Sequence, residues 1–228
     1  MQLSEILKNV ELVDAISANV EIKNIQFDSR KVEAGSLFVA TRGTAVDGHD
    51  YIAKAVEAGA VAIVCEDMPS EQQANVAYIK VKDSAEALGR MASNFYGRPS
   101  EQLTLVGVTG TNGKTTTKEL LATVLSTKYH LHYTQGNLNN QIGVPLTLLQ
   151  LTRAHEMAIV EMGASHPGDI KELVDIAEPN CGLITNVGRA HLEGFGSFEG
   201  VQQTKKELYD YLRAHQGFIF RNMDNPYL

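Results

Sequence analysis

A glycine-rich turn lies near the middle of the chain, where residues 107–117 read GVTGTNGKTTT. An apolar run at residues 103–108 leads into it, and a helix-favouring stretch follows. The order strand, glycine loop, helix aims successive backbone N–H groups and the positive end of a helix dipole at one point, where a phosphate can bind. A chain with this order of elements is expected to be an α/β protein whose helix packs back on a parallel sheet.

Two side chains of the turn suit a nucleotide, because Lys114 adds a mobile cation and Thr115 offers a hydroxyl to a magnesium ion. The spacing fits the phosphate-loop pattern G-x-x-x-x-G-K-[ST] only in part, since the pattern requires glycine at Val108 and the sequence has it at Gly107. The alternative is a turn that joins strand to helix for packing. The context T-G-T-N-G-K-T-T favours nucleotide binding. The residues expected to bind ATP are Gly110, Thr111, Asn112, Gly113, Lys114, Thr115 and Thr116.

Composition limits the class of protein. The chain has 228 residues, 43% of them hydrophobic, which suffices for one large or two small packed domains. Its net charge of -7 argues against nucleic acid as a partner. Cys65 and Cys181 lie in apolar runs and are too few for a disulfide framework. The start does not look like a secretion signal and no apolar run reaches about 18 residues, so we expect a cytoplasmic protein without a membrane partner.

The pattern of apolar residues predicts two domains, 1–98 and 99–228, with the turn-forming cluster Gly97-Arg98-Pro99-Ser100 at their boundary. In the first domain we expect strands at 22–27, 36–40, 61–64 and 77–81 and helices at 49–58 and 84–95. In the second we expect strands at 103–108, 157–161, 181–186 and 217–220 and helices at 114–127, 168–177 and 198–214. Apolar strands separated by helices indicate a parallel sheet covered on both faces, with its ligand crevice at the carboxyl ends of the strands.

Several polar residues fall at that predicted edge. Glu161 closes an apolar strand and would pair with the loop hydroxyl as an oxygen ligand of magnesium, although a solvated carboxylate or a salt bridge would also explain it. His191 follows the next strand, where a structural or exposed histidine is the alternative. Three amides, Asn137, Asn139 and Asn140, lie in a loop for which turn chemistry is the alternative.

These residues stand in strings that resemble the Mur ligases, ATP-dependent amide-forming enzymes that build the peptidoglycan precursor in the bacterial cytoplasm. From residue 118 onward the chain is similar to the member that adds D-alanyl-D-alanine, through TQGNLNNQIGVPLTLL, AIVEMGASHPGDI, TNVGRAHLEGFGSFEGV and NMDNPYL. The resemblance implies a small amino-terminal α/β UDP-sugar-binding domain followed by a P-loop parallel-sheet ATPase domain.

The first 100 residues also resemble this family, but they look closer to the member that adds the third amino acid. The similarity is carried by DGHDYIAKAVEAGAVAIVCE and DSAEALGRMASNFYG. Because GVTGTNGKTTT is common to both enzymes, a junction there would leave no trace, and we hypothesise a hybrid of the two ligases. Three functions stay open: addition of D-alanyl-D-alanine, addition of a diamino acid, and a binding module without ligation.

The resemblance implies that the substrate's carboxylate attacks the γ-phosphate of ATP, giving an acyl phosphate from which an amine displaces phosphate. Lys114 and the loop amides would neutralise the phosphate charge. Thr115 and Glu161 would hold the first magnesium ion, and His191 resembles a ligand of the second.

The family also uses a lysine carbamate as a ligand of the second metal. Lys205 is the candidate, because TKKE at 204–207 lines up with the family's A-K-G-E. Its neighbour Lys206 differs by about 100° around the helix, so only one of the two can face the metal. A solvated helical face is the default for such a pair.

The substrates implied are a UDP-MurNAc-peptide and D-alanyl-D-alanine or a diamino acid. The resemblance assigns the UDP-sugar contacts to Ser29, Arg30, Gly43, Thr44 and His49. It places Asn137, Asn139 and Asn140 between the two substrate sites, and Asn222 and Asn225 at the adenine. Turn formation is the alternative for Gly43. Mur ligases carry a third, carboxyl-terminal domain that helps to close the site, and the resemblance implies that this chain lacks it.

Overall fold

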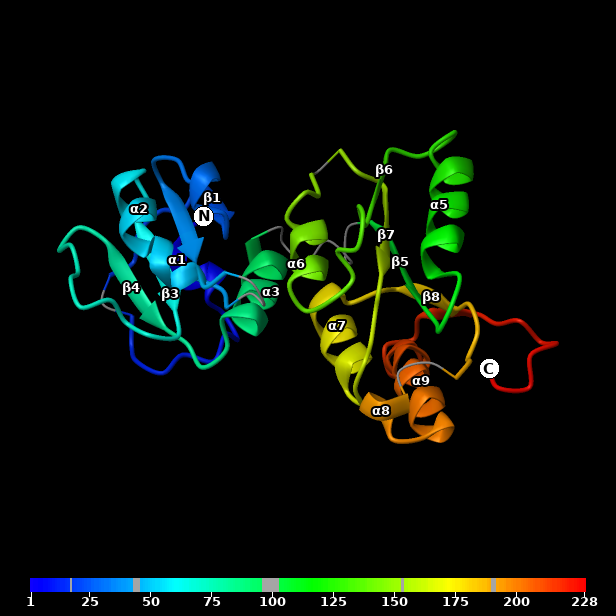
Figure 1. The fold of residues 1–228 in the computed structure, drawn as a ribbon. Coiled ribbons are helices and arrows are strands. Elements are labelled where there is room, and N and C mark those ends of the chain that lie inside the picture. Colours follow the sequence, from blue (N-terminus) through cyan, green and yellow to red (C-terminus); the bar gives the residue numbers. More distant parts are fainter. Residues whose placement is uncertain (17, 43–45, 96–102, 153, 190–191) are drawn as a thin grey trace. The chain divides into compact units, whose positions relative to one another are not determined.

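The computed structural model describes residues 1–228 except 17, 43–45, 96–102, 153 and 190–191. The chain divides into two compact units, Met1–Phe95 and Tyr96–Leu228 (Figure 1). The predicted boundary between residues 98 and 99 lies outside the described residues, so it stays a prediction. No helix of the described part is long and apolar enough to cross a membrane.

The first unit is built on a four-stranded parallel sheet in the order β1-β2-β3-β4. Its strands are β1 (Asn24–Gln26), β2 (Ser36–Val39), β3 (Ala62–Cys65) and β4 (Ala77–Lys80). Its helical elements are α1 (Leu3–Ile6), η1 (Ser29–Lys31), η2 (Gly48–Tyr51), α2 (Ile52–Glu57) and α3 (Ser84–Phe95). The two inner strands are buried along their whole length, as a parallel sheet requires, and the four predicted strands are confirmed.

The predicted helix 49–58 is divided into the 3-10 turn η2 and the α-helix α2. Asp47 is the cause, since its carboxylate accepts the His49 N–H at 2.9 Å and starts a tight turn ahead of the helix. Tyr51 then leaves helical geometry, with φ -109° and ψ 5°, before α2 begins. The predicted helix 84–95 has the bounds of α3.

The second unit holds a five-stranded parallel sheet in the order β6-β7-β5-β8-β9 (Figure 1). Its strands are β5 (Thr104–Thr109), β6 (Leu131–Tyr133), β7 (Met157–Glu161), β8 (Cys181–Ile184) and β9 (Phe218–Phe220). Its helices are α5 (Lys114–Leu125), α6 (Gly143–Leu148), α7 (Asp169–Ala177), α8 (Leu192–Phe195) and α9 (Phe198–Ala214). The expected α/β class is confirmed.

Alternate residues of the strands face two different cores. Leu105 and Val160 pack with α6, α7 and α9 on one face, whereas Val106 and Ile159 pack with α5 on the other. Figure 1 shows α5 on one side of this sheet and α6 and α7 on the other. The sheet is thus covered on both faces, and β5 lies between β7 and β8. In such a sheet ligands bind beyond the carboxyl ends of the strands where the strand order reverses.

Two elements near this edge were not predicted. β6 has only three residues, too few to show a periodic pattern. α6 contains Gly143 and Pro145, which have poor helix propensity, but all six of its residues are buried, so packing decides its conformation. Gly143 has no room for a Cβ, which would collide with the Leu138 backbone.

Candidate functional site

The glycine-rich turn runs from the end of β5 to the start of α5 and bends at two glycines. Gly110 has φ +142° and Gly113 has φ +77°, in the range where glycine is favoured. A Cβ on Gly110 would collide with Thr185 Oγ1, whereas a Cβ on Gly113 would meet no atom within 4 Å. The first glycine is therefore required by a close approach and the second by backbone conformation alone.

Gly107, which departs from the phosphate-loop pattern, lies inside β5 rather than in the turn. A Cβ there would lie 3.0 Å from Leu208 Cδ1 of α9. A Cβ on Gly182, its partner in β8, would lie 3.2 Å from Cδ2 of the same leucine. Gly107 thus serves strand–helix packing, and the packing alternative holds for this glycine.

The segment after β8 fastens the turn. Thr185 Oγ1 donates to Asn112 O at 2.7 Å, and the Asn186 side chain both donates to Asn112 O at 2.9 Å and accepts from Asn112 N at 3.1 Å. Gly188 N donates to Thr111 Oγ1 at 2.9 Å. The sequence analysis assigned no role to Thr185, Asn186 or Gly188, although their place after a strand of the same sheet was a usable signal. These bonds hold the turn in shape before any ligand binds.

Lys114 and Thr115 begin α5, and their side chains bind different parts of the site. The Lys114 ammonium donates to Gly110 O at 2.9 Å and Thr111 O at 3.2 Å, so it lies over the turn. Burial lowers its pKa, and the charge of Glu161 opposes that shift. Thr115 Oγ1 donates to Glu161 Oε1 at 3.2 Å, which joins the turn to the end of β7. Thr116 points to solvent.

Glu161 is 1% exposed and its two oxygens differ. Oε1 accepts from Thr115 Oγ1 and, at 2.8 Å, from Asn139 Nδ2. Oε2 is buried and has no hydrogen-bond partner among the residues that the structure describes, which is unusual for a carboxylate oxygen. A free carboxylate oxygen next to a loop hydroxyl is a donor set that suits a hard divalent cation.

Lys118 is a member of this site that the sequence analysis missed. Its side chain is 0% exposed, and its ammonium donates to Thr134 O at 2.7 Å and lies 3.8 Å from Glu161 Oε2. It also pairs with Glu119 Oε1 at 3.1 Å. The signal was its spacing of four residues from Lys114, which puts both side chains on one helix face.

The three predicted amides separate in the structure. Only Asn139 contacts Glu161. Asn140 Oδ1 accepts from Gly143 N at 2.9 Å and Ile142 N at 3.3 Å, which caps the start of α6. Asn137 is exposed and its carbonyl accepts from Asn139 N at 2.8 Å. Turn chemistry thus accounts for what Asn140 does in this structure.

The lysine pair of α9 also separates. Lys205 is 3% exposed, and its ammonium lies 5.6 Å from the centre of the Phe195 ring. Burial lowers the pKa of Lys205 to about 8, and the positive charge of Lys114 adds to the shift. Lys206 lies outside and pairs with Asp210 at 3.1 Å. Lys205 is therefore the inward-facing member of the pair.

His191 lies outside the described residues. In the rest of the chain no group of three or more His, Cys, Asp or Glu side chains is arranged to hold a metal.

Asn222 and Asn225, the predicted adenine contacts, form turns near the end of the chain. The side chain of each accepts a backbone N–H from the residue two positions later, Asp224 and Tyr227, at 3.0 Å.

The first unit has a pocket of about 430 Å³ at the end of the sheet. Ser29 and Arg30 line it, as does Gly48, where a Cβ would lie 2.7 Å from Thr41 O. The Arg30 guanidinium makes two bonds to Asp28, at 2.9 and 2.8 Å, which lower the pKa of that carboxyl to about 2. The other lining residues are Phe27, Asp28, Phe38, Thr41, Val46, Tyr51 and Lys54. Gly43 and Thr44 lie outside the described residues.

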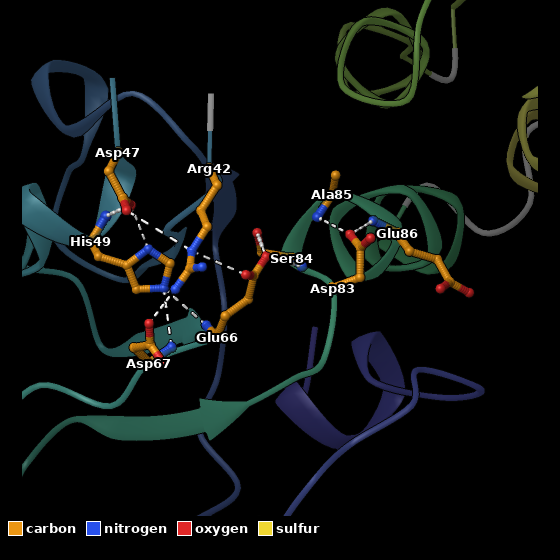
Figure 2. Close-up of polar contacts among 9 residues, drawn as sticks. All are labelled: Arg42, Asp47, His49, Glu66, Asp67, Asp83, Ser84, Ala85 and Glu86. Atoms are coloured by element: carbon orange, nitrogen blue, oxygen red, sulfur yellow. Dashed lines mark hydrogen bonds and ion pairs between the residues drawn. The ribbon is translucent and has the colours of Figure 1, made fainter. Parts of the chain in front are cut away.

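His49 lies in a network of polar contacts rather than in this pocket (Figure 2). Its Nε2 accepts from Glu66 N at 3.0 Å and Asp67 N at 3.2 Å, so the ring proton is on Nδ1, which donates to Asp47 at 2.6 Å. The Arg42 guanidinium lies near the carboxylates of the same three residues, Asp47, Glu66 and Asp67, with Nε 3.2 Å from Glu66 Oε2. His49 thus ties the segment before η2 to the end of β3.

Comparison with known proteins divides the chain close to the boundary between the two compact units. A family model described as the Mur ligase middle domain matches residues 108–228, and one described as Mur ligase family, catalytic domain, matches residues 21–96. A UDP-N-acetylmuramoyl-tripeptide--D-alanyl-D-alanine ligase of Synechocystis sp. is 44% identical over 219 residues, which cover 95% of this chain and 47% of that protein.

A UDP-N-acetylmuramoyl-L-alanyl-D-glutamate--2,6-diaminopimelate ligase of Parabacteroides distasonis is 41% identical over 242 residues, covering 99% of this chain and 49% of that protein. The crystal structure of MurF ligase from Thermotoga maritima in complex with ADP is 39% identical with a TM-score of 0.74, covering 83% of this chain and 43% of that one. The chain spans about half the length of the curated relatives it matches.

Proposed function

Because this chain belongs to the Mur ligase family, we propose that it carries the sugar-nucleotide and ATP sites of a MurF-type ligase. Such a ligase joins D-alanyl-D-alanine to UDP-MurNAc-tripeptide at the expense of ATP, through an acyl phosphate. The observation that carries the proposal is the buried Glu161 carboxylate, which is bonded through Oε1 to Thr115 of the glycine-rich turn and whose Oε2 accepts no hydrogen bond from any described residue. The family's nucleotide chemistry needs a cation site at this point.

The turn and Lys114 are proposed to hold the phosphates of ATP. The backbone N–H groups at the start of α5 point beyond the sheet edge, and the Lys114 ammonium lies over the turn, within reach of a bound phosphate. Thr185 and Asn186 keep the turn in this shape, so little ordering remains to be done when the nucleotide arrives. The similarity to a MurF ligase solved with ADP supports the same location.

Magnesium fits the residues at the end of β7. Thr115 Oγ1 and Glu161 would hold it, since both are oxygen donors and Glu161 has an oxygen to spare. When bound with ATP, the ion neutralises charge on the phosphate oxygens. Asn139 fixes the rotamer of Glu161 through Oε1, which leaves Oε2 for the ion.

Lys205 is proposed as the lysine that takes up carbon dioxide. Only an uncharged amine adds to carbon dioxide, and burial lowers the pKa of Lys205 to about 8, which raises the uncharged fraction at neutral pH. Lys206, exposed and paired with Asp210, lacks this environment. His191 is proposed as a neighbouring ligand of the second metal.

The pocket of the first unit is proposed to bind the UDP part of the substrate. Arg30 and Lys54 supply positive charge for a diphosphate, and Phe27 and Tyr51 supply apolar rings for a base. Ser29, Gly43 and Thr44 are proposed as further contacts. His49 is proposed to act indirectly, by holding the segment that leads into the pocket.

ADP release tests the proposal. The purified chain is incubated with ATP, magnesium, UDP-MurNAc-tripeptide and D-alanyl-D-alanine, and ADP is followed with and without the dipeptide amine. We expect amine-dependent ADP release that Lys114→Met abolishes and that Lys128→Met, at an exposed position after α5, leaves unchanged. Amine-dependent release that is unaffected by Lys114→Met would contradict the assignment of the turn.

Two other functions stay open. The 41% identity to a diaminopimelate-adding ligase favours MurE-type addition of a diamino acid, which predicts ADP release with UDP-MurNAc-dipeptide and the diamino acid instead. A binding module without ligation predicts that both substrates bind and no ADP forms. Calorimetric binding of the two UDP-MurNAc-peptides separates all three when read with the ADP assay.

The hybrid hypothesis stays a prediction. Both kinds of ligase align with more than nine-tenths of the chain, so each is similar to both halves. Comparing residues 1–98 and 118–228 separately with each ligase would test the hypothesis, and one ligase ranking first for both halves would contradict it. We also propose a cytoplasmic location, which agrees with the free, buried Cys65 and Cys181.

A further inference from the structure

Lys118 is a fully buried cation that the proposed function does not use. It lies on α5 one turn beyond Lys114, with its ammonium 3.8 Å from Glu161 Oε2 and 2.7 Å from Thr134 O. The first distance is too long for a hydrogen bond, so the interaction with Glu161 is between charges. A buried carboxylate with no cation nearby would be strongly destabilising, and Lys118 provides that cation in the protein without ligands.

The ammonium is fixed in place. Thr134 accepts Lys118 Nζ with its carbonyl oxygen and accepts Glu161 N with its hydroxyl oxygen at 3.0 Å. One residue of the segment after β6 therefore contacts both the Lys118 ammonium and the backbone of Glu161, whose carboxylate is held through Oε1 by Thr115 and Asn139. The Lys118 side chain is completely buried, so its charge stays in the site in the structure described.

Any divalent cation that binds Glu161 Oε2 must therefore lie close to the Lys118 ammonium. Without nucleotide, the Lys118 ammonium lies 3.1 Å from Glu119 Oε1 and 3.8 Å from Glu161 Oε2, and Lys114 adds a second positive charge at the same edge. Inside a protein, the repulsion between a cation at Glu161 Oε2 and the nearby Lys118 ammonium is large. A bound triphosphate brings several negative charges and reverses the balance.

We propose that Lys118 is a positioning residue that stands in for the charge of the metal in the nucleotide-free protein, and that it makes divalent-cation binding at Glu161 depend on the nucleotide. The inference rests on the proposed function, because it takes Glu161 and Thr115 as the ligands of the ion. Its consequence is that the cation enters the site together with the nucleotide and not before it.

Binding of Mn²⁺, a paramagnetic substitute for Mg²⁺, tests this by electron paramagnetic resonance with and without a non-hydrolysable ATP analogue. We expect the wild-type chain to bind Mn²⁺ alone about 100-fold more weakly than with the analogue. In Lys118→Met, the affinity for Mn²⁺ alone should rise about tenfold, which corresponds to about 1.4 kcal/mol. The matched control is Lys128→Met, which removes an exposed positive charge just after the same helix and should behave as wild type.

Unchanged affinity for Mn²⁺ alone in Lys118→Met would overturn the inference. Tight binding of Mn²⁺ alone by the wild type would overturn it as well, and this measurement needs no variant, so it decides even if Lys118→Met fails to fold. The variant Glu161→Gln distinguishes failure of the inference about Lys118 from failure of the proposed function. If Glu161→Gln binds Mn²⁺ with the analogue as tightly as wild type does, Glu161 is not the ligand and the proposed function itself is wrong at this point.

Discussion

Gly110→Ala probes the close approach on which the shape of the phosphate-binding turn depends. The backbone of Gly110 has φ +142°, which costs an alanine about 1–3 kcal/mol. The added Cβ would collide with Thr185 Oγ1 and would lie 3.1 Å from Asn186 N. Thr185 cannot yield freely, since its hydroxyl is bonded to Asn112 O, and such overpacking costs about 1–3 kcal/mol. Together these two costs should lower the free energy of unfolding by about 2–6 kcal/mol.

The same change should weaken nucleotide binding, because the turn can relieve the collision only by moving away from Thr185 and Asn186. We expect calorimetry with a non-hydrolysable ATP analogue to show at least about a tenfold loss of affinity, about 1.4 kcal/mol. Gly113→Ala is the matched control, since it lies in the same turn at φ +77° with no atom near its Cβ, and should lose only about 1 kcal/mol of stability. Equal losses in the two variants would refute the argument from close approach. In Gly110→Ala, the further change Thr185→Ala should restore part of the stability.

Three further changes test other parts of the structure. Leu208→Ala should lower the free energy of unfolding by about 2–5 kcal/mol in urea denaturation, because Leu208 is fully buried against the glycines of β5 and β8, whereas the exposed Leu120→Ala should change it by less than about 0.5 kcal/mol. His49→Ala leaves two backbone N–H groups without their acceptor and should cost about 1–3 kcal/mol; an unchanged melting temperature would show that the network is dispensable. Asp28 has its pKa lowered to about 2, so it contributes stability that is present above its usual pKa of 3.8 and is lost as the pH falls toward 2; Arg30→Met should raise that pKa in a carboxyl NMR titration.

The regular elements could be predicted because each carries its own signal. The strands at 36–40, 77–81 and 157–161 are short apolar runs bounded by turns, and the helix at 198–214 has both an apolar face and a capping Ser197 that accepts Gly200 N at 3.0 Å. β6 and α6 lack such signals, and tertiary burial forms them. Glu161 was placed correctly at the sheet edge because it ends a strand next to β5 in a parallel sheet.

The contacts that complete the site could not be predicted in this way, because they join residues that are far apart in the sequence. The bonds from Thr185 and Asn186 to Asn112 join residues more than 70 positions apart, and no local pattern encodes them. The sequence analysis did not single out Lys118, because the groups around its ammonium, the Tyr133 ring and Thr134 O, lie in and just after the unpredicted β6. The same unpredicted strand leads to Thr134, whose carbonyl oxygen accepts from Lys118 Nζ and whose hydroxyl oxygen accepts from Glu161 N. Substitutions in β6 that shift Thr134 should therefore move the Lys118 ammonium and alter cation binding without touching a ligand of the metal.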